Sequence, residues 1–154
     1  MACPGVTTIP SSPNLGPMTT MTIYVSENST DSALVQEGLR AFNAQHVPPA
    51  VARPLHVIAK AGGEVLGGLI GVSLWNWFFI RDLWVADSHR RTGVGSKIIK
   101  IAEQAAKERG CEFAHLDTFS FQARGFYEKN GYHVFGTLPN YPRGSDRFYL
   151  MKQL

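Results

Sequence analysis

The sequence predicts a single domain of the α/β (α+β) class, in which helices flank a mixed, mostly antiparallel sheet of about seven strands. Three observations support this class. The chain has 154 residues, an ordinary length for one domain. Hydrophobic residues make up 44% and charged residues 18% of it, so it can bury a core. Apolar periodicity follows the order strand, helix, three strands, helix, strand, helix, two strands, which is typical of a mixed sheet.

The N-terminal segment differs in composition from the rest of the chain. Residues 1–20 are rich in Pro, Ser and Thr, and the first charged residue is Glu27. A secretory signal needs basic residues followed by a long apolar stretch, and this segment has neither. We therefore expect a poorly ordered leader over 1–20 and a domain over 21–154. The longest apolar stretch, 67–80, is too short to cross a bilayer. Cys3 and Cys111 form no metal-like pair, so we expect a cytoplasmic protein without disulfides or a bound metal.

The first half of the domain contains four predicted strands and one helix. Residues 21–27 alternate apolar and polar side chains, as a first strand does. Residues 29–46 predict a helix that Ser29 or Asp31 caps. Its apolar face consists of Ala33, Leu34, Leu39 and Phe42. Three further strands are expected over about 55–61, 64–74 and 77–85.

Paired glycines mark two positions among these strands. Gly62-Gly63 is typical of a tight hairpin turn between the strands 55–61 and 64–74. Gly67-Gly68 lies inside a strand, where it indicates a bulge or a close approach of another backbone.

The second half alternates between helix and strand. Residues 94–110 predict the best helix of the chain, with Gly110 as its natural stop. Its apolar face consists of Ile98, Ile101, Ala102 and Ala105. The remaining expected elements are a strand over 111–119, a short helix over 122–131 and a closing antiparallel pair over 132–138 and 146–154.

The turn between Val85 and the helix 94–110 has the features of an anion site. Four N–H groups at a helix start have no internal partner, and the helix dipole adds positive charge there. Arg90, Arg91 and Lys97 surround this start. Gly93 permits a tight loop, Gly95 leaves room for a ligand and Ser96 adds a hydroxyl. The segment therefore indicates a phosphate or pyrophosphate site, although a tight turn with solvated arginines would need the same residues. It matches neither the P-loop nor the dinucleotide fingerprint.

Two stretches resemble the GCN5-related N-acetyltransferase (GNAT) superfamily. Arg90-Arg91-Thr92-Gly93-Val94-Gly95 is similar to the family's Q/R-x-x-G-x-G/A motif, and 123–132, ARGFYEKNGY, is similar to its later A-x-x-[LF]-Y-x-x-x-G-[FY] segment. The resemblance covers about 22–154. It implies that the first motif holds the pyrophosphate of acetyl-coenzyme A. It also implies that two parallel strands, the one ending at Val85 and the one over 111–119, splay apart to admit the pantetheine arm.

The resemblance also implies the residues that bind acetyl-coenzyme A. The family's general acid corresponds to Tyr127, and the oxyanion donor is a backbone amide near Val85. Many members have Asn where this chain has Ser120, which puts that contact in doubt. The expected binding residues are Leu83, Trp84, Val85, Arg90, Arg91, Thr92, Gly93, Val94, Gly95, Ser96, Ser120, Ala123, Phe126 and Tyr127.

Adjacent residues on a helix point about 100° apart, so Phe126 and Tyr127 cannot share one face. We expect Phe126 in the core and Tyr127 facing the cofactor sulfur. The alternative for Tyr127 is a role in packing alone. The general base is open among Asp82, Asp117, His115 and a water relay. Asp82 ranks first, and its structural alternative is a salt bridge to Arg81 or Arg124.

The acceptor is expected to be a primary amine of a small molecule, with Phe42, Trp75, Trp77, Asp82 and Tyr141 around it. Trp75 and Trp77 would share a strand face, or else fill the core or an interface of a homodimer. The resemblance extends to aminoglycoside N-acetyltransferases, and a kasugamycin-type resistance enzyme is the sharpest hypothesis. The alternatives are acetylation of a protein lysine or N-terminus and a non-catalytic acyl-coenzyme A sensor. Nucleic acid is not an expected partner, because the basic residues cluster at one helix start and not along a stripe. A membrane is not expected either, because the longest apolar stretch is too short to cross it.

Overall fold

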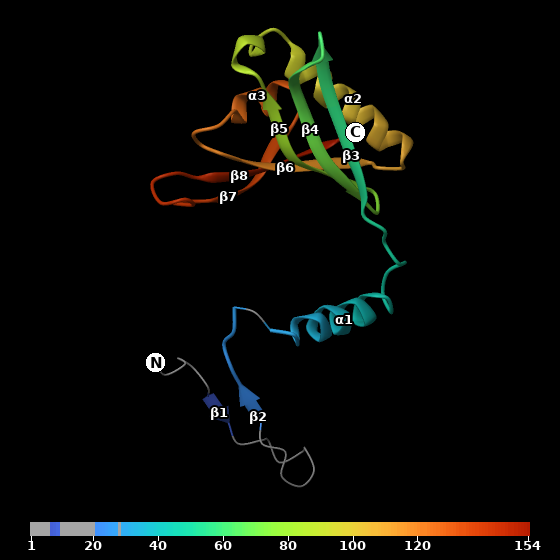
Figure 1. Ribbon diagram of the computed structural model, residues 1–154, viewed down its shortest axis with the longest axis vertical. Helices are drawn as coiled ribbons and strands as arrows, with labels where there is room; N and C mark the ends of the chain where they lie inside the picture. The colour runs from blue at the N-terminus through green and yellow to red at the C-terminus, as the bar shows by residue number, and fades with distance from the viewer. Residues whose placement is uncertain (1–6, 10–20, 28) are drawn as a thin grey trace. The chain divides into compact units, whose positions relative to one another are not determined.

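The computed structural model describes residues 7–9, 21–27 and 29–154 (Figure 1). The chain forms two compact units, Met1–Pro49 and Ala50–Leu154. The expectation that 21–154 form one domain stays a prediction. Apart from Thr7–Ile9, the expected leader lies outside the described residues.

The first unit contains a strand pair and one helix. Strand β1 (Thr7–Ile9) pairs antiparallel with β2 (Met21–Ile23), and α1 spans Ser32–Asn43. Asp31 is the residue that precedes α1, but its carboxylate accepts a hydrogen bond from the Tyr24 hydroxyl at 2.8 Å instead of capping the helix. Helix α1 buries no residue, so its predicted apolar face is not packed within this unit.

The second unit is built on a six-stranded sheet in the order β3-β4-β5-β6-β8-β7 (Figure 1). The strand bounds are Arg53–Ala61 for β3, Glu64–Leu74 for β4, Trp77–Val85 for β5, Phe113–Phe119 for β6, His133–Leu138 for β7 and Arg147–Gln153 for β8. All neighbours run antiparallel except β5 and β6, which are parallel. The predicted class and the mixed, mostly antiparallel sheet are confirmed, with six strands in this sheet and β1–β2 as a separate pair.

The paired glycines behave as expected. Gly62 and Gly63 connect β3 to β4 with φ of +57° and +87°, which other residues rarely adopt. A Cβ at Gly67 would lie 2.7 Å from the Trp84 carbonyl oxygen, so β5 approaches the backbone of β4 closely. The register of β3 and β4 also shifts beside Gly67.

Helix α2 (Val94–Glu108) covers one face of this sheet, across β3, β4 and β5 (Figure 1). Its buried apolar side chains are Ile98, Ile99, Ala102 and Ala106, which pack with sheet residues such as Leu69, Phe78 and Leu116. Burying one large apolar side chain stabilises the fold by about 1.5–3 kcal/mol. Ile101, predicted on this face, is 58% exposed, because Ile98, Ile99, Ala102 and Ala106 lie on another side of the helix and form the face that contacts the sheet.

A polar network ties α2 to β8 and to Tyr132, the residue before β7. Glu103 is 8% exposed and accepts hydrogen bonds from the Tyr132 hydroxyl at 3.0 Å and from Lys152 Nζ at 2.7 Å. Each partner thus compensates the burial of the Glu103 carboxylate. Burial, and then the neighbouring carboxylate, raise the pKa of Tyr132 far above its ordinary value.

In the described part of the chain, no helix combines the length and the apolar character that crossing a membrane requires.

Candidate functional site

Strands β5 and β6 part halfway along their length. Their parallel pairing runs from Trp77 opposite Phe113 to Ile80 opposite Leu116. At that point the register of β4 and β5 shifts, so that Arg81 has no counterpart in β4. Beyond it, no described residue of 81–85 pairs with β6, whose remaining residues pair with β8. The predicted splay is therefore confirmed, and it leaves one backbone edge of β5 without a strand neighbour.

This gap opens into a cleft of about 1070 Å³. Four segments line it: the end of β5, the turn into α2, the end of β6 with the loop that follows, and α3 (Arg124–Lys129). Its lining residues are Arg81, Asp82, Leu83, Trp84, Val85, His89, Arg90, Arg91, Gly93, Gly95, Ser96, Asp117, Thr118, Phe121, Gln122, Ala123, Phe126, Tyr127 and Lys129.

The turn into α2 is fixed by its own side chains. A short 3₁₀ helix spans Asp87–His89, and Arg90 bridges back with Nε donating to the Val85 carbonyl at 3.1 Å and Nη2 2.7 Å from Asp87 Oδ1. Gly93 precedes α2 with φ of +89°, and the first turn of α2 contains no acidic residue. The free N–H groups, the helix dipole and the nearby arginines together favour an anion at this end of the cleft.

Gly95 lies in the first turn of α2, against α3. A Cβ at Gly95 would lie 3.1 Å from Phe126 Cζ and 3.2 Å from Phe126 Cε2. The missing side chain therefore lets α3 pack against the start of α2. The two motifs on which the sequence interpretation rests meet here.

Tyr127 lines the cleft and is also buried. Its exposure is 9%, and its ring contacts those of Phe126 and Tyr132 edge-on at 5.3 and 6.1 Å. Tyr127 belongs to the core cluster and Phe126 is a half-buried residue packed against it, so the expectation that Phe126 is the core residue of the two is wrong. Both residues line the cleft. Burial and then Asp117 raise the pKa of Tyr127 to about 12, which keeps the phenol protonated.

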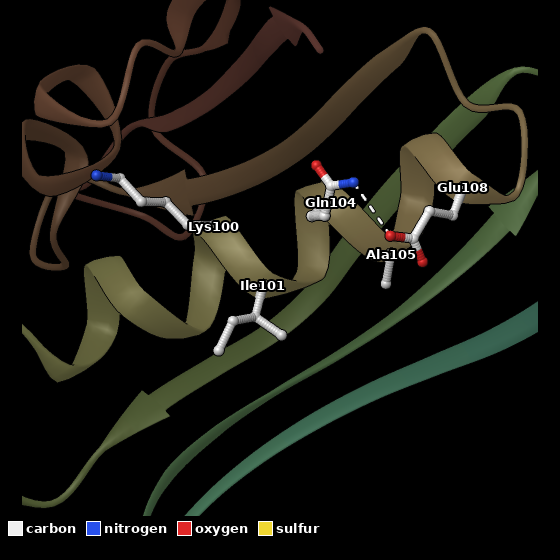
Figure 2. A pocket seen from close by; sticks show the side chains of 5 residues that line it. All are labelled: Lys100, Ile101, Gln104, Ala105 and Glu108. Carbon is white, nitrogen blue, oxygen red and sulfur yellow. Dashed lines mark hydrogen bonds between the residues drawn. The ribbon is translucent and has the colours of Figure 1, made fainter.

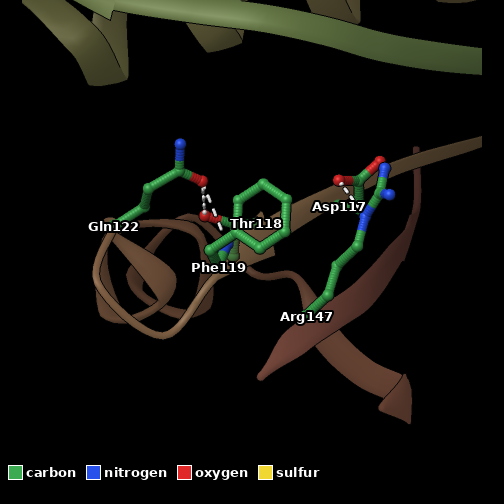
Figure 3. Close-up of polar contacts among 5 residues, drawn as sticks. All are labelled: Asp117, Thr118, Phe119, Gln122 and Arg147. Carbon is green, nitrogen blue, oxygen red and sulfur yellow. Dashed lines mark hydrogen bonds and ion pairs between the residues drawn. The ribbon is translucent and has the colours of Figure 1, made fainter. Parts of the chain in front are cut away.

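Two carboxylates face the gap from its two strands. Asp82, on β5, is exposed and pairs with Arg81 Nε at 2.8 Å, as the structural alternative expected. Asp117, on β6, is mostly buried and accepts a hydrogen bond from Arg147 Nε at 2.7 Å (Figure 3). The Arg147 guanidinium also lies over the rings of Phe119, Tyr141 and Tyr149, at 5.3, 5.5 and 5.5 Å from their centroids.

His115 does not line the cleft. Its ring stacks on Phe79 at 4.8 Å and meets Trp77 edge-on at 5.7 Å. Burial lowers the pKa of His115, and Asp117 partly opposes that shift. In the structure His115 is thus a half-buried residue that packs against Phe79 and Trp77.

Several predicted residues lie outside the cleft. Thr92, Val94 and Ser120 are near its walls without lining it. Tyr141 lies behind Phe119, with ring centroids 6.3 Å apart. Phe42 belongs to the first unit, so the structure does not place it relative to the cleft.

The two tryptophans do not share a strand face. Trp75 has φ of +50° and lies in the turn after β4, so the alternation assumed for it does not apply. Trp77 is at the start of β5, far along the strand from Val85, and stacks on Phe113 at 4.8 Å. Neither lines the cleft.

The sequence interpretation missed part of the loop between β6 and α3. Phe121 and Gln122 line the cleft, along with Arg81, His89, Thr118 and Lys129. The signal that could have found the first two is their position directly after a splayed strand, where loop residues commonly carry function.

A second, smaller depression of about 340 Å³ lies on the outer side of α2 (Figure 2). Its lining consists of Lys100, Ile101, Gln104, Ala105 and Glu108, none of which reaches the cleft. Within the described ranges, the chain has no group of three or more His, Cys, Asp or Glu side chains that could hold a metal ion.

The chain is similar to proteins of one family. Residues 23–132 match the model of the acetyltransferase (GNAT) family. Over 121 residues the chain is 40% identical to the blasticidin-S acetyltransferase of Streptomyces morookaense, a match that covers 75% of this chain and 88% of that protein.

Solved structures agree. A crystal structure of an acetyltransferase from Bacillus cereus ATCC 14579 matches with a TM-score of 0.79 at 28% identity, and covers 86% of this chain and 98% of that one. An aminoglycoside 6'-N-acetyltransferase complexed with coenzyme A matches with a TM-score of 0.62 over 82% of each chain. At 20% identity, the second likeness bears on the fold alone.

Proposed function

The chain belongs to the acetyltransferase (GNAT) family, and we propose that it transfers the acetyl group of acetyl-coenzyme A to a primary amine of a small molecule. The observation that carries this proposal is the continuous cleft between the splayed strands. It begins at an anion site, the start of α2, and includes the buried phenol of Tyr127. A donor that is polyanionic at one end and reactive at the other matches these two features.

The phosphate end of the donor fits the turn into α2. Gly93 has open space around its missing Cβ, and Arg91 and Ser96 line the cleft beside it. Backbone N–H groups of the first turn would hold the pyrophosphate, since they have no acceptor within the helix. Gly95 contributes by letting Phe126 pack against this first turn, since the space beside its missing Cβ is filled by Phe126 and not open to a ligand.

The pantetheine arm fits the free edge of β5. Between Arg81 and Val85 this edge has no strand partner among the described residues, so its backbone groups can pair with the two amides of the arm as an added strand does. Leu83, Trp84 and Val85 all line the cleft. The oxyanion donor proposed near Val85 would belong to the same edge.

The chemical step needs a neutral amine, a stabilised oxyanion and a proton for the departing thiolate. We propose that Tyr127 supplies the proton to the departing thiolate, because its raised pKa keeps the phenol protonated, as a general acid must be. Asp82 and Asp117 both reach the cleft and are the candidates to take the proton from the amine, directly or through water. Asp82 ranks first because its ion pair with Arg81 is exposed to solvent, whereas the ion pair between Asp117 and Arg147 is mostly buried.

The acceptor is proposed to enter from the face of the sheet opposite α2. Alternate residues of β6 point to the two faces. Leu116 and Thr118 are buried in the core, whereas Asp117 and Phe119 are on the other face, half-buried. Phe119 stacks in parallel on Phe121 with centroids 5.2 Å apart, and Tyr141 adjoins it. These rings suit an acceptor that carries a ring, while the Asp117 carboxylate is already paired with Arg147, whose guanidinium lies over Phe119 and Tyr141.

An antibiotic is the acceptor class that we favour. The support is the 40% identity to a relative that is named a blasticidin-S acetyltransferase. Blasticidin S is therefore the first acceptor to test, and the kasugamycin hypothesis stays a prediction beside it. Trp75, Trp77 and Phe42 have no assigned place in this acceptor site.

The test is a thiol-release assay with acetyl-coenzyme A and a panel of amines. The panel holds blasticidin S, kasugamycin, other aminoglycosides and lysine peptides. The proposal predicts release that depends on a small-molecule amine. Release with peptides alone would instead assign a protein acetyltransferase. Cofactor binding without release on any amine would leave an acyl-coenzyme A sensor.

A further inference from the structure

We propose that the side-chain amide of Gln122 donates a hydrogen bond to an amide carbonyl of the pantetheine arm of the bound acyl donor. The inference rests on the proposed function for the identity of that donor. It assigns a binding residue that neither motif of the sequence contains.

The orientation of the Gln122 amide is fixed by two donors. The backbone N–H of Phe119 donates to Gln122 Oε1 at 2.9 Å, and the Thr118 hydroxyl lies 3.0 Å from the same oxygen (Figure 3). A backbone N–H can only donate, so the oxygen of the amide must be on that side. Thr118 is 2% exposed, and the backbone N–H of Gln122 donates to the Phe119 carbonyl at 2.9 Å, which closes the turn. The side chain is therefore held rather than free to rotate.

The amide nitrogen is left as the outward group. Figure 3 shows it on the side of Gln122 away from Thr118 and Phe119. Gln122 lines the cleft, and Nε2 has no hydrogen-bond acceptor among the described residues. A donor that is oriented in advance and unused loses little conformational entropy when an acceptor arrives.

The chemistry of the cleft indicates which acceptor this is. The phosphates have charged and helix-dipole partners at the start of α2, on the other wall. A neutral amide donor matches a neutral carbonyl, and the pantetheine arm carries two of them between the phosphates and the thioester. Gln122 follows the splayed end of β6, in the wall of the cleft across the gap from the free edge of β5.

Ser120, the residue expected at this contact, is engaged elsewhere. Its hydroxyl accepts a hydrogen bond from the Asp146 N–H at 3.2 Å, and its own N–H donates to the Asp146 carbonyl at 2.8 Å. It ties the loop before β8 to the end of β6 and does not line the cleft. Gln122 supplies the amide that Ser120 lacks.

The decisive variant is Gln122→Glu. A glutamate keeps an oxygen for Phe119 and Thr118, so the turn is retained, but it replaces the outward donor by a second acceptor. We expect the melting temperature to stay near that of the wild type and the KM for the acyl donor to rise about tenfold. Gln104→Glu, on the outer side of α2, adds the same charge away from the cleft and controls for the effect of charge on KM; it also removes the hydrogen bond that Gln104 Nε2 donates to Glu108 at 3.1 Å, so its melting temperature is not the reference (Figure 2).

Gln122→Glu also adds a negative charge that could repel the phosphates of acetyl-coenzyme A, so the variant must be measured with a second acyl donor. S-acetylpantetheine carries the same arm without phosphates, so repulsion between the introduced carboxylate and a phosphate cannot act on it. A KM rise of similar size with both donors in the Gln122→Glu protein supports the contact. A rise with acetyl-coenzyme A alone overturns it, because the effect is then long-range repulsion. A KM change for the amine acceptor alone also overturns it.

A measurement on the unaltered protein covers the case in which the variant does not fold. The side-chain amide signals of Gln122 in a ¹⁵N-labelled wild-type protein should shift when S-acetylpantetheine is titrated in. Unmoved signals at saturation contradict the inference. If the wild type binds neither donor, it is the proposed function that fails, so the two failures are distinguishable.

Discussion

Phe126 of α3 lies against Gly95 of α2 so closely that a Cβ at Gly95 would be 3.1 Å from Phe126 Cζ. The contact joins the glycine-rich turn and the aromatic helix, which are 31 positions apart in the chain (126 − 95). It makes the shape of the anion end of the cleft depend on the absence of one methyl group.

Gly95→Ala should therefore weaken binding of the acyl donor. The added methyl group forces the Phe126 ring to move by a few tenths of an ångström, and that ring lines the cleft. We expect the KM for acetyl-coenzyme A to rise about 3- to 10-fold, the equivalent of about 0.7–1.4 kcal/mol. Steady-state kinetics with the donor varied measures it.

Gly93→Ala is the contrasting variant. Its Cβ would meet nothing within 4 Å, but φ is +89°, so the strain is in the backbone. We expect a loss of about 1–2 kcal/mol in the free energy of unfolding of Gly93→Ala, measured by urea denaturation.

For Gly95→Ala, a KM for acetyl-coenzyme A equal to that of the wild type would contradict the argument that Phe126 lies too close to Gly95 for a methyl group.

Tyr127→Phe should lower kcat by about 100-fold or more, the range for loss of a general acid. The Tyr127 hydroxyl donates to no described residue, so its removal should leave the melting temperature nearly unchanged. Stopped assays at saturating donor and acceptor measure kcat. A folded Tyr127→Phe protein with full turnover would show that the tyrosine only packs.

The pH dependence of kcat tests the same residue in the unaltered protein. Burial and Asp117 raise the pKa of Tyr127 from 10.0 to about 12, so the phenol loses its proton only at higher pH than an ordinary tyrosine. The acid is active below its pKa, so Tyr127 should cause no decline in kcat up to about pH 10. A decline centred near pH 10 that Tyr127→Phe abolishes would contradict this environment.

Asp82→Asn separates the candidate bases. The amide keeps the shape of the side chain but cannot accept the proton of the amine. We expect the acidic limb of the pH profile of kcat, measured at saturating amine so that protonation of the free amine does not contribute, to disappear in this variant. If the wild-type limb is retained, Asp82 is not the base, and Asp117→Asn becomes the variant to examine.

Glu103→Gln tests the network under α2. The amide can still accept from Tyr132, but it leaves the ammonium of Lys152 without its buried counter-charge. We expect a loss of about 1–3 kcal/mol in the free energy of unfolding, read from urea denaturation. Glu108→Gln, exposed on the same helix, should change it by no more than about 0.5 kcal/mol. Equal effects of the two substitutions would mean that burial of Glu103 is unimportant.

Strands β4 and β5 have the predicted bounds 64–74 and 77–85, and Gly62-Gly63 marks the turn before β4. Strand β3 ends where predicted but begins at Arg53, two residues before the expected start at Leu55. The splay could be predicted because a helix start, glycines and a family motif coincide in one short segment; the anion site at the same segment stays a prediction.

Other features depend on contacts that local pattern does not contain. The predicted relative burial of Phe126 and Tyr127 is wrong: Phe126 packs on Gly95 at the wall of the cleft, a contact with a residue 31 positions earlier in the chain (126 − 95) that local pattern does not contain. Trp75 and Trp77 fit a strand alternation that the turn interrupts. Ser120 could not be recognised as a loop anchor without knowing that Asp146 folds back onto the end of β6.

The most direct test of acetyl transfer to a small amine is a mass spectrum of the acceptor after incubation with acetyl-coenzyme A labelled with ¹³C in the acetyl group. The account predicts an acceptor that gains one labelled acetyl group, with fragments that place it on a primary amine, and that stays unlabelled without the protein. Label that appears on a hydroxyl group, or only on peptides, would contradict it.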